Sequence, residues 1–278
     1  MNIHTTAIVS KKALLGNNVR IMPYAYIDDD VEIGDNTIIG PHAVILRYTK
    51  IGANCKIHSH TVIGDLPQDI TFKEAPTYVK IGNNNVIREG VTIHRGTKPE
   101  SITEIGDNCY LMANSHVAHN VKIENNVIIA NGALLAGYVE VGERTFISGN
   151  VLVHQFVRIG KIAMLSGGSA ISKDVPPFCT TQGVSGNIIL GLNIVGLRRA
   201  GILPEDRLAL KRAFRTLYLS GINITEAINK IRKTETSKIV HEFCDFISST
   251  KRGICVTRRT NRFTVDDSVD DFEKENLD

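Results

Sequence analysis

Large aliphatic residues recur at every sixth position along most of this 278-residue chain. The register holds in two runs, Ile3 to Ile63 and Ile105 to Ile171, and three further members lie between them: Ile81, Ile87 and Ile93. A period of six fits neither the roughly 3.6 residues of an α-helical turn nor the two of a half-buried strand, so it indicates an internal repeat. Hexapeptide repeats are typical of a parallel β-helix, which is the predicted fold.

A column of small residues accompanies the aliphatic one. Alanine, valine, threonine or cysteine stands four positions after each aliphatic of the first run, and glycine, asparagine and aspartate are common between them. We expect a triangular coil with three short strands per turn, aliphatic and small side chains inside, and residues that tolerate positive φ at the corners. One turn takes three sixes, so residues 18 apart lie directly above one another, at a spacing of about 4.8 Å.

The six-residue register breaks at two places. Polar or small residues, Asp69 and Ala75, replace the first pair of missing aliphatics, and Pro99 replaces the next. These breaks predict loops extruded from the coil at about residues 64–80 and 97–104. Loops held by a rigid scaffold often carry function.

The chain divides into successive regions. The coil is predicted for residues 1–180, because two consecutive prolines near its end cannot donate ladder hydrogen bonds. A glycine-rich crossing segment follows over 181–203, and the hydrophobic period then becomes that of α-helices over 204–253. In this C-terminal helical domain, Thr225 is the predicted N-cap of the second helix.

Charge is distributed unevenly. The net charge is +3, yet residues 264–278 hold seven acids and one lysine, so the remainder of the chain carries +9. We expect an acidic, disordered tail over 254–278 and a body that attracts acidic partners. Nucleic acid is disfavoured as a partner, because no lysine and arginine block with interleaved aromatics occurs outside the helical end.

Cysteine usage and hydropathy point to a cytoplasmic protein. The five cysteines show no paired spacing, as expected in a reducing compartment. The repeat begins at Ile3, which leaves no room for a signal peptide, and no uninterrupted apolar stretch is long enough to span a bilayer.

Several residues with useful chemistry fall in one part of the coil. Counting in eighteens stacks His119, Gly137 and Gln155 in one column, with His154 beside Gln155 and His116 three positions before His119. An imidazole base, a glycine N–H facing an oxyanion and an orienting amide are the parts of an acyl-transfer site. Because no serine or cysteine nucleophile accompanies them, direct attack by a deprotonated acceptor is favoured over a covalent acyl-enzyme.

Two other interpretations of these histidines were weighed. They could be corner residues bonded to neighbouring carbonyls, which their clustering disfavours. They could also bind zinc through His94, His116 and His119. Residues 94 and 116 are 22 apart, four off a stacked position, and no carboxylate stands ready to orient a ligand. Since zinc needs three converging ligands, we expect no metal.

Five segments of the chain together resemble one family. They are IREGVTIHRGT (87–97), LMANSHVAHN (111–120), VHQFVRIG (153–160), SKDVPPF (172–178) and GLNIVGLRRAG (191–201). The sequence resembles the UDP-N-acetylglucosamine acyltransferases of lipid A synthesis, the LpxA family, over about residues 1–253. The resemblance implies a left-handed parallel β-helix with a C-terminal α-helical domain, assembled as a homotrimer with sites between subunits. The repeat period alone does not give the hand.

The resemblance also implies an activity. Members of this family transfer a fatty acyl group, typically 3-hydroxyacyl, from acyl carrier protein to the 3-hydroxyl of UDP-N-acetylglucosamine, the first step of lipid A synthesis. The donor is the phosphopantetheine thioester of the carrier protein, and no other cofactor is implied. Acyl carrier protein is acidic, which suits the basic body of this chain.

Residue roles follow from the same resemblance. His119 matches the general base, and the Gly137 N–H matches the oxyanion donor. The positions that match substrate contacts are Gln68, Asp69, His116, Tyr138, His154, Gln155, Asn193 and Arg199. Gly167 matches the position that sets acyl-chain length.

The chain departs from the family pattern near the acceptor. Tyr138 stands where a sugar-contacting histidine is usual and Val195 where a glutamate is usual, while Thr71, Asn120 and Val184 replace a lysine, an aspartate and an asparagine. These departures leave alternatives open. The acceptor could be a UDP-3-amino sugar or another nucleotide sugar, or the chain could be a hexapeptide protein that binds without turnover.

Overall fold

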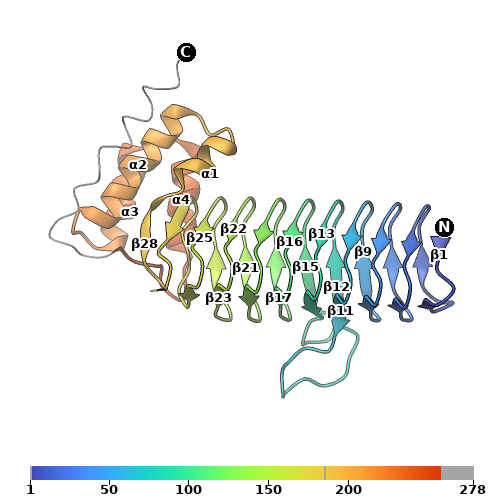
Figure 1. Ribbon diagram of the computed structural model, residues 1–278. Coiled ribbons are helices and arrows are strands. Elements are labelled where there is room, and N and C mark those ends of the chain that lie inside the picture. Colours follow the sequence, from blue (N-terminus) through green and yellow to red (C-terminus); the bar gives the residue numbers. More distant parts are fainter. Residues whose placement is uncertain (1, 185, 258–278) are drawn as a thin grey trace, which may run out of the picture.

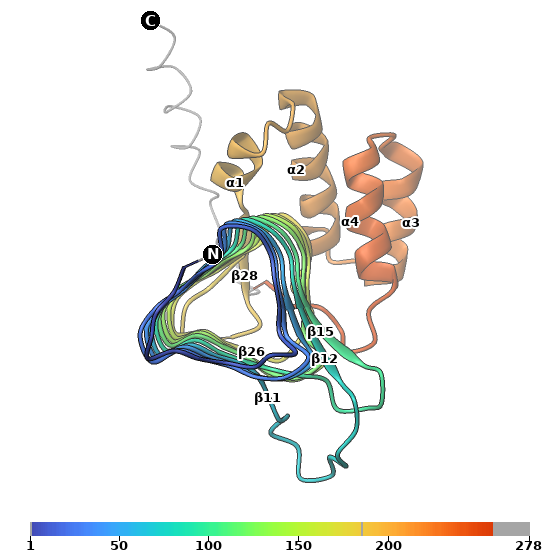
Figure 2. The ribbon, with the colours of Figure 1, turned by 90° about the vertical axis from the view of Figure 1, so that its right-hand side faces the viewer.

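The chain forms a straight triangular coil with helices packed at its C-terminal end (Figure 1). The computed structural model describes residues 2–184 and 186–257. Seen from the N-terminal end in Figure 2, the chain turns counterclockwise as it recedes from the viewer. The β-helix is therefore left-handed, against the usual right-handed preference for parallel crossovers.

Within the described residues the strands form three sheets, one on each side of the triangle. The eleven-stranded sheet contains β1 (Asn2–Ile3), β4 (Arg20–Ile21), β7 (Ile38–Ile39), β10 (Lys56–Ile57), β13 (Val86–Ile87), β16 (Tyr110–Leu111), β19 (Ile128–Ile129), β22 (Phe146–Ile147), β25 (Met164–Leu165), β27 (Cys179–Thr181) and β28 (Ile189–Leu192). The nine-stranded sheet contains β2 (Ile8–Val9), β5 (Tyr26–Ile27), β8 (Val44–Ile45), β11 (Val62–Asp65), β14 (Thr92–His94), β17 (His116–Val117), β20 (Leu134–Leu135), β23 (Leu152–Val153) and β26 (Ala170–Ile171). The eight-stranded sheet contains β3 (Leu14–Leu15), β6 (Glu32–Ile33), β9 (Thr49–Ile51), β12 (Tyr78–Ile81), β15 (Ile102–Ile105), β18 (Lys122–Ile123), β21 (Glu140–Val141) and β24 (Arg158–Ile159).

Successive turns pair in parallel with the predicted register of 18. Ile3 lies opposite Ile21, for example, and Leu135 opposite Val153. The strand N–H groups of one turn donate to carbonyls of the next, as Asn2 N does to Val19 O at 2.9 Å. These hydrogen bonds fix which residues are neighbours along the axis.

The interior is filled as the two columns predict. The aliphatic residues from Ile21 onward and the small residues from Val19 onward are almost wholly buried, and all five cysteines are free and buried. Asparagine occupies many left-handed corner positions, as expected. The corners are not restricted to Asn, Asp and Gly, however, because Tyr138, Phe156 and Ile162 also have positive φ. Bulky residues are strained there, so packing must hold them in place.

Both extruded loops leave from the corner between the nine- and eight-stranded sheets (Figure 2). The strands around the first loop reach further than expected, so this loop spans 66–77 rather than 64–80. The second spans 95–101 rather than 97–104, because β14 ends earlier and β15 begins earlier than expected. Arg95 anchors the longer loop: its Nη2 donates to Glu74 Oε1 at 2.6 Å, and its guanidinium lies over the Phe72 ring at 5.8 Å. The longer loop is therefore tied to the first residue of the shorter loop.

The C-terminal region contains four helices. They are α1 (Ile194–Arg199), α2 (Pro204–Leu219), α3 (Ile224–Thr234) and α4 (Lys238–Ser248). The last three match the predicted helical domain. Asn223, not Thr225, caps α3, because Asn223 Oδ1 accepts from Glu226 N at 2.9 Å.

Two boundaries near the C-terminus differ from the prediction. The crossing segment 181–203 holds strand β28, which pairs antiparallel with β27, and helix α1. The predicted tail begins too early: Ile254 and Cys255 are buried, and Val256 bridges to Ile188. Their apolar side chains close the end of the coil. The rest of the predicted tail, residues 258–278, lies outside the described residues.

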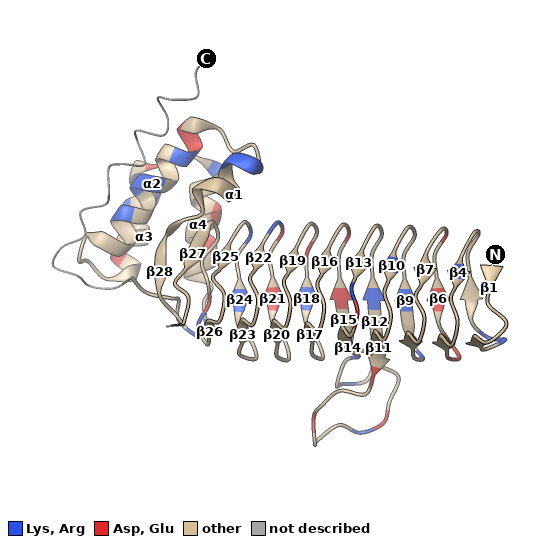
Figure 3. Ribbon diagram, viewed as in Figure 1, with Lys and Arg blue, Asp and Glu red and all other residues tan. Residues whose placement is uncertain are grey.

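The three outward faces differ in chemistry. The eight-stranded sheet presents a ladder of charged residues of both signs, in which Glu32 pairs with Lys50 at 2.6 Å and Lys80 pairs with Glu104 at 3.0 Å (Figure 3). The other two sheets present mainly apolar residues. No helix among the described residues is long and apolar enough to cross a membrane.

Strand β18 offers a matched test of the core, because it places Lys122 outside and Ile123 inside. Ile123→Ala should lower the free energy of unfolding by about 2–5 kcal/mol through the cavity it leaves. Lys122→Ala should change it by less than about 0.5 kcal/mol. Urea unfolding followed by circular dichroism measures both, and equal losses would contradict the assigned inward face.

Candidate active site

A groove of about 700 Å³ runs along the C-terminal half of the nine-stranded sheet. Most of its polar lining comes from predicted site residues: Gln68, His116, His119, Gly137, His154 and Gln155. Its floor is apolar. Leu134, Leu152 and Ala170 stand in register on neighbouring strands, and the two leucines are 42% and 49% exposed. The groove therefore combines a polar end with an apolar channel.

The predicted column at the corner is observed. Tyr138 N donates to His119 O at 3.1 Å and Phe156 N donates to Gly137 O at 3.0 Å, so the three turns stack. A Cβ on Gly137 would lie 2.6 Å from His119 Nε2, closer than side chains approach one another. Glycine is therefore required for the imidazole to lie here. Among the described residues no acceptor takes the Gly137 N–H.

His119 is oriented by its neighbour in sequence. Its Nδ1 lies 3.1 Å from Asn120 Oδ1, and its ring meets that of Tyr138 edge-on, with centroids 5.3 Å apart. An imidazole that donates from Nδ1 leaves Nε2 free to accept a proton. His119 thus has the geometry of a general base.

His116 is held as a neutral imidazole. Burial, with smaller effects of the neighbouring His94 and His119, lowers its pKa to about 4. Its Nδ1 lies 2.7 Å from Thr92 Oγ1. A neutral ring beside the base can contact a substrate through hydrogen bonds without repelling a charged imidazolium.

The longer loop brings two polar side chains to the groove. Gln68 lines it directly. Asp69 Oδ1 accepts from Thr71 N at 2.9 Å and from Thr71 Oγ1 at 2.8 Å. These hydrogen bonds, with a smaller effect of His119, lower the pKa of Asp69. A carboxylate is therefore kept ionised near the base.

Five predicted site residues do not line this groove: Asp69, next to Gln68 in the longer loop, and four that lie elsewhere. Asn193 caps α1 through Gly196 N and donates to Ile162 O at 2.8 Å, in the corner opposite the nine-stranded sheet. Arg199 is exposed on the same helix, Gly167 lies at the corner between β25 and β26, and Tyr138 borders a separate hollow on the side of the eight-stranded sheet. A single chain does not unite the two groups, so their joint role stays a prediction.

Sequence reasoning missed the apolar floor and two polar neighbours. Leu134, Leu152 and Ala170 each immediately precede a six-phase aliphatic, and that offset is the signal that places them on the outer face. Asn187 lines the end of the groove, and Arg252 Nη2 lies 3.2 Å from His154 Nδ1. No local pattern marks these last two, because distant segments bring them to the site.

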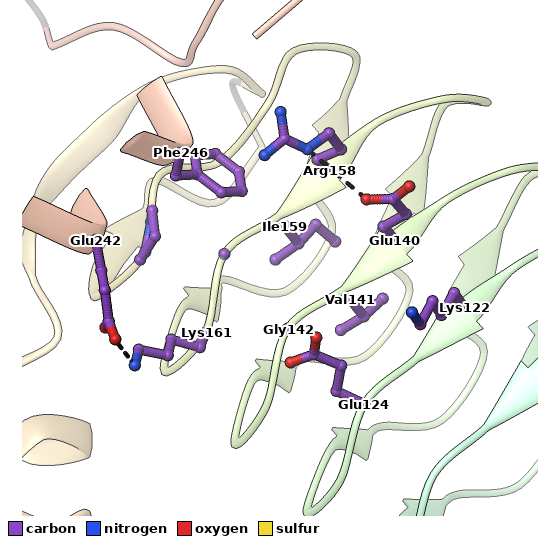
Figure 4. Close-up of a pocket in the computed structure, with 12 residues that line it drawn as sticks. Lys122, Glu124, Glu140, Val141, Gly142, Arg158, Ile159, Lys161, Glu242 and Phe246 are labelled. Carbon is purple, nitrogen blue, oxygen red and sulfur yellow. Dashed lines mark ion pairs between the residues drawn. The ribbon is translucent and has the colours of Figure 1, made fainter. Parts of the chain in front are cut away.

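A second cavity, of about 410 Å³, lies between the eight-stranded sheet and α4 (Figure 4). Its charged residues are largely paired, Arg158 with Glu140 at 3.7 Å and Lys161 with Glu242 at 2.5 Å. Such a lining shows no preference for an anion or a cation. Across residues 2–184 and 186–257, no group of three or more His, Cys, Asp or Glu is arranged to hold a metal.

Comparisons with known proteins agree with the fold. The bacterial transferase hexapeptide repeat matches residues 12–47 and 102–137, and domain 2 of UDP N-acetylglucosamine O-acyltransferase matches 174–255. The chain is 42% identical to the acyl-[acyl-carrier-protein]–UDP-N-acetylglucosamine O-acyltransferase of Campylobacter concisus over 91% of this chain and 97% of that protein. It is 47% identical to the corresponding enzyme of Thermodesulfovibrio yellowstonii over 91% of this chain and 98% of that protein.

A solved structure, the UDP-N-acetylglucosamine acyltransferase of Campylobacter jejuni, is similar with a TM-score of 0.87 and 42% identity over 92% of this chain and all of that one. Fold, groove and histidine column together define a hexapeptide-repeat acyltransferase. The chain belongs to the UDP-N-acetylglucosamine acyltransferase family, LpxA.

The depressed pKa of His116 has a consequence for stability. In the unfolded chain this residue takes up a proton near pH 6.5, whereas in the folded chain it does so only near pH 4. Its contribution is therefore complete above pH 6.5 and is lost as the pH falls toward 4. Between pH 7.5 and 5.0 the urea midpoint of His116→Asn should fall less than that of the unaltered protein, because this histidine no longer takes up a proton on unfolding. Equal drops would contradict a buried neutral imidazole.

Proposed function

We propose that this chain transfers a fatty acyl group from acyl carrier protein to the 3-hydroxyl of UDP-N-acetylglucosamine, the first step of lipid A synthesis. The observation that carries the proposal is the His119 imidazole, with Nε2 free, against the unpaired Gly137 N–H at the polar end of an apolar groove. The names of the relatives support the choice of donor and acceptor.

The groups account for each step of the reaction. His119 Nε2 takes the proton of the acceptor hydroxyl as its oxygen attacks the thioester carbonyl. The oxyanion that develops accepts a hydrogen bond from Gly137 N–H. Collapse of this intermediate breaks the carbon–sulfur bond, and the imidazolium returns its proton to the leaving thiolate. The products are the acylated sugar and the free thiol of the carrier protein, so no further cofactor is needed.

The apolar floor suits the acyl chain. Leu134, Leu152 and Ala170 lead away from His119 along the axis over three neighbouring turns. Burial of methylene groups on such a surface contributes about 0.8 kcal/mol each. The basic body of the chain, +9 without its last 15 residues, favours the acidic carrier protein and the diphosphate of the acceptor.

The protein is also proposed to act as a homotrimer. Besides the nine-stranded face, the eleven-stranded sheet presents half-buried apolar residues in register on five successive strands: Val86, Tyr110, Ile128, Phe146 and Met164. Two adjoining apolar faces and one charged face suit packing around a three-fold axis. A neighbouring chain could then supply Asn193 and Arg199 to the groove. Free cysteines and reliance on carrier protein support a cytoplasmic location.

Two departures from the family pattern bear on the acceptor. Tyr138 and Val195 replace family residues near the sugar and nucleoside. A UDP-3-amino sugar would be acylated through the same geometry, because an amine also loses a proton during attack. A protein that only binds these ligands would bind both and turn over neither.

His119→Ala should reduce transfer by at least about 10²-fold, since a general base typically contributes 10²–10⁴. The measurement is formation of acylated product from acyl carrier protein thioester with UDP-N-acetylglucosamine and, in parallel, its 3-amino analogue. His42→Ala serves as the control, because this exposed corner histidine stacks between Tyr24 and His60 far from the groove. Undiminished turnover by His119→Ala would overturn the assigned base, and faster turnover of the amine would revise the acceptor.

Sedimentation equilibrium should give three times the 30.5 kDa mass of the chain. Ile128→Lys on the eleven-stranded face should shift the protein toward monomer, because it places a charge in the apolar column. Glu140→Lys on the charged face is the matched control and should leave the mass unchanged. A monomeric unaltered protein with full activity would contradict the trimer.

A further inference from the structure

Asn120 is surrounded by donors that determine which way its amide points. Its Oδ1 lies 3.1 Å from Thr97 N, 2.9 Å from Thr97 Oγ1 and 3.1 Å from His119 Nδ1. The backbone N–H of Thr97 can only donate, so the atom that faces it must be the oxygen. His119 Nδ1 faces the same oxygen and must therefore carry the proton. The tautomer of His119 follows from a backbone donor in the shorter loop.

The Thr97 hydroxyl extends this arrangement to Tyr138. Because Asn120 Oδ1 is only an acceptor, the Thr97 hydroxyl gives its single hydrogen to it. Tyr138 Oη, 2.9 Å from Thr97 Oγ1, must then be the donor to Thr97. The direction of each hydrogen bond is thus settled: Tyr138 donates to Thr97, and Thr97 donates to Asn120. The Asn120 oxygen also accepts a hydrogen bond from His119 Nδ1.

Packing holds the tyrosine in a strained position. Tyr138 has a φ of 61°, in the left-handed region that favours Asn or Gly. Its ring stacks on Phe156, with centroids 4.8 Å apart and planes 13° apart, and meets the His119 ring edge-on. Strain of this kind persists where the surroundings compensate for it, and it is common at functional sites.

Neither Thr97 nor Tyr138 lines the groove. Tyr138, Phe156 and Asn120 border a separate hollow on the side of the eight-stranded sheet. The groove on the other side of the corner is lined by His119 and Gly137. A hydroxyl that is committed to Thr97 behind the base is placed to act through His119 rather than on the acceptor.

We propose that Thr97 and Tyr138 are positioning residues that hold the Asn120 amide oxygen on His119 Nδ1 and so keep Nε2 bare. This inference rests on the proposed function, because it assigns a support to the proposed base. The other titratable groups around His119 are Asp69 on the longer loop, His94 and His116 on neighbouring strands, and Tyr138. The negative charge near the base then comes from Asp69. The tautomer of His119 is set by an uncharged chain of hydrogen bonds, the Thr97 relay, which runs from Tyr138 through Thr97 to Asn120.

Single substitutions separate positioning from substrate contact. Thr97→Val removes the hydroxyl and should lower kcat about three- to tenfold, the range expected for one hydrogen bond, with KM for both substrates unchanged. Thr97→Ser restores the hydroxyl and should restore kcat. Tyr138→Phe keeps the stack on Phe156 and should lower kcat by a smaller factor. Tyr78→Phe, which loses a hydroxyl bonded to Glu100 at 3.0 Å, is the matched control and should have no effect.

The double variant Thr97→Val with Tyr138→Phe tests the relay itself. If the tyrosine acts through Thr97, the double variant should have the kcat of Thr97→Val alone. Multiplied effects would overturn the relay. A raised KM for the nucleotide sugar in Tyr138→Phe with unchanged kcat would also overturn it, because that result assigns the hydroxyl to the acceptor.

Two further readouts do not respond to a purely structural role. Nitrogen-15 shifts of His119 should report one tautomer, protonated at Nδ1, in the unaltered protein and a larger fraction protonated at Nε2 in Thr97→Val, where only the backbone N–H of residue 97 still holds the Asn120 oxygen; the same tautomer ratio in both would refute the proposal. Asn120→Asp places a carboxylate beside His119 Nδ1, which stabilises the imidazolium. The acid limb of the kcat/KM profile should therefore move to higher pH. An unmoved limb would place Asn120 out of contact with the base.

The outcomes distinguish this inference from the proposed function. If the unaltered protein transfers no acyl group, or His119→Ala remains active, the proposed function fails whatever Thr97 does. If the unaltered protein is active and His119→Ala is not, but Thr97→Val matches the unaltered protein in rate and tautomer, only the positioning inference fails.

Discussion

The structure depends on the parallel hydrogen bonds between successive turns. They lock a register of 18 residues, and that register places each outward side chain in line with others from distant parts of the sequence. The line from His116 through Leu134 and Leu152 to Ala170 is one result. The stacking of His119 on Gly137 is another. Binding surface and chemistry are therefore both consequences of backbone pairing, and neither needs a specialised domain.

The corner beside the groove is where regular geometry and function conflict. Asparagine and glycine fit the left-handed corner positions, but Tyr138 and Phe156 occupy two successive ones in this column. Their stacking offsets part of the strain and gives the base a firm support from behind. The neighbouring Gly137 shows the opposite solution, because loss of a side chain creates the space for an imidazole. Tyr138 thus supports the His119 ring, and the adjacent Gly137 leaves space for it.

Sequence reasoning succeeded where the repeat determines position and failed where it does not. The coil, its two loops, the buried columns and the stacking of His119 under Gly137 all follow from counting in sixes and eighteens. Strand β28, helix α1 and the Asn223 cap lie outside the repeat, where short local signals compete. The Thr97 relay also escaped, because it joins a loop to a corner through contacts that no periodicity encodes.

The direction of the ladder makes the two ends of the solenoid unlike. Strand N–H groups point toward the C-terminal end, where Ser172 N and Lys173 N donate to Asn187 Oδ1 and Asp174 N donates to Gly253 O. At the first turn the strands offer carbonyl oxygens, and two backward-facing donors are already satisfied, Thr6 N by His4 and Lys12 N by Ser10. Two copies meeting by their first turns would bring acceptor against acceptor, and a head-to-tail meeting would find the donors covered. The polarity of the backbone thus disfavours end-to-end association of these coils into a filament.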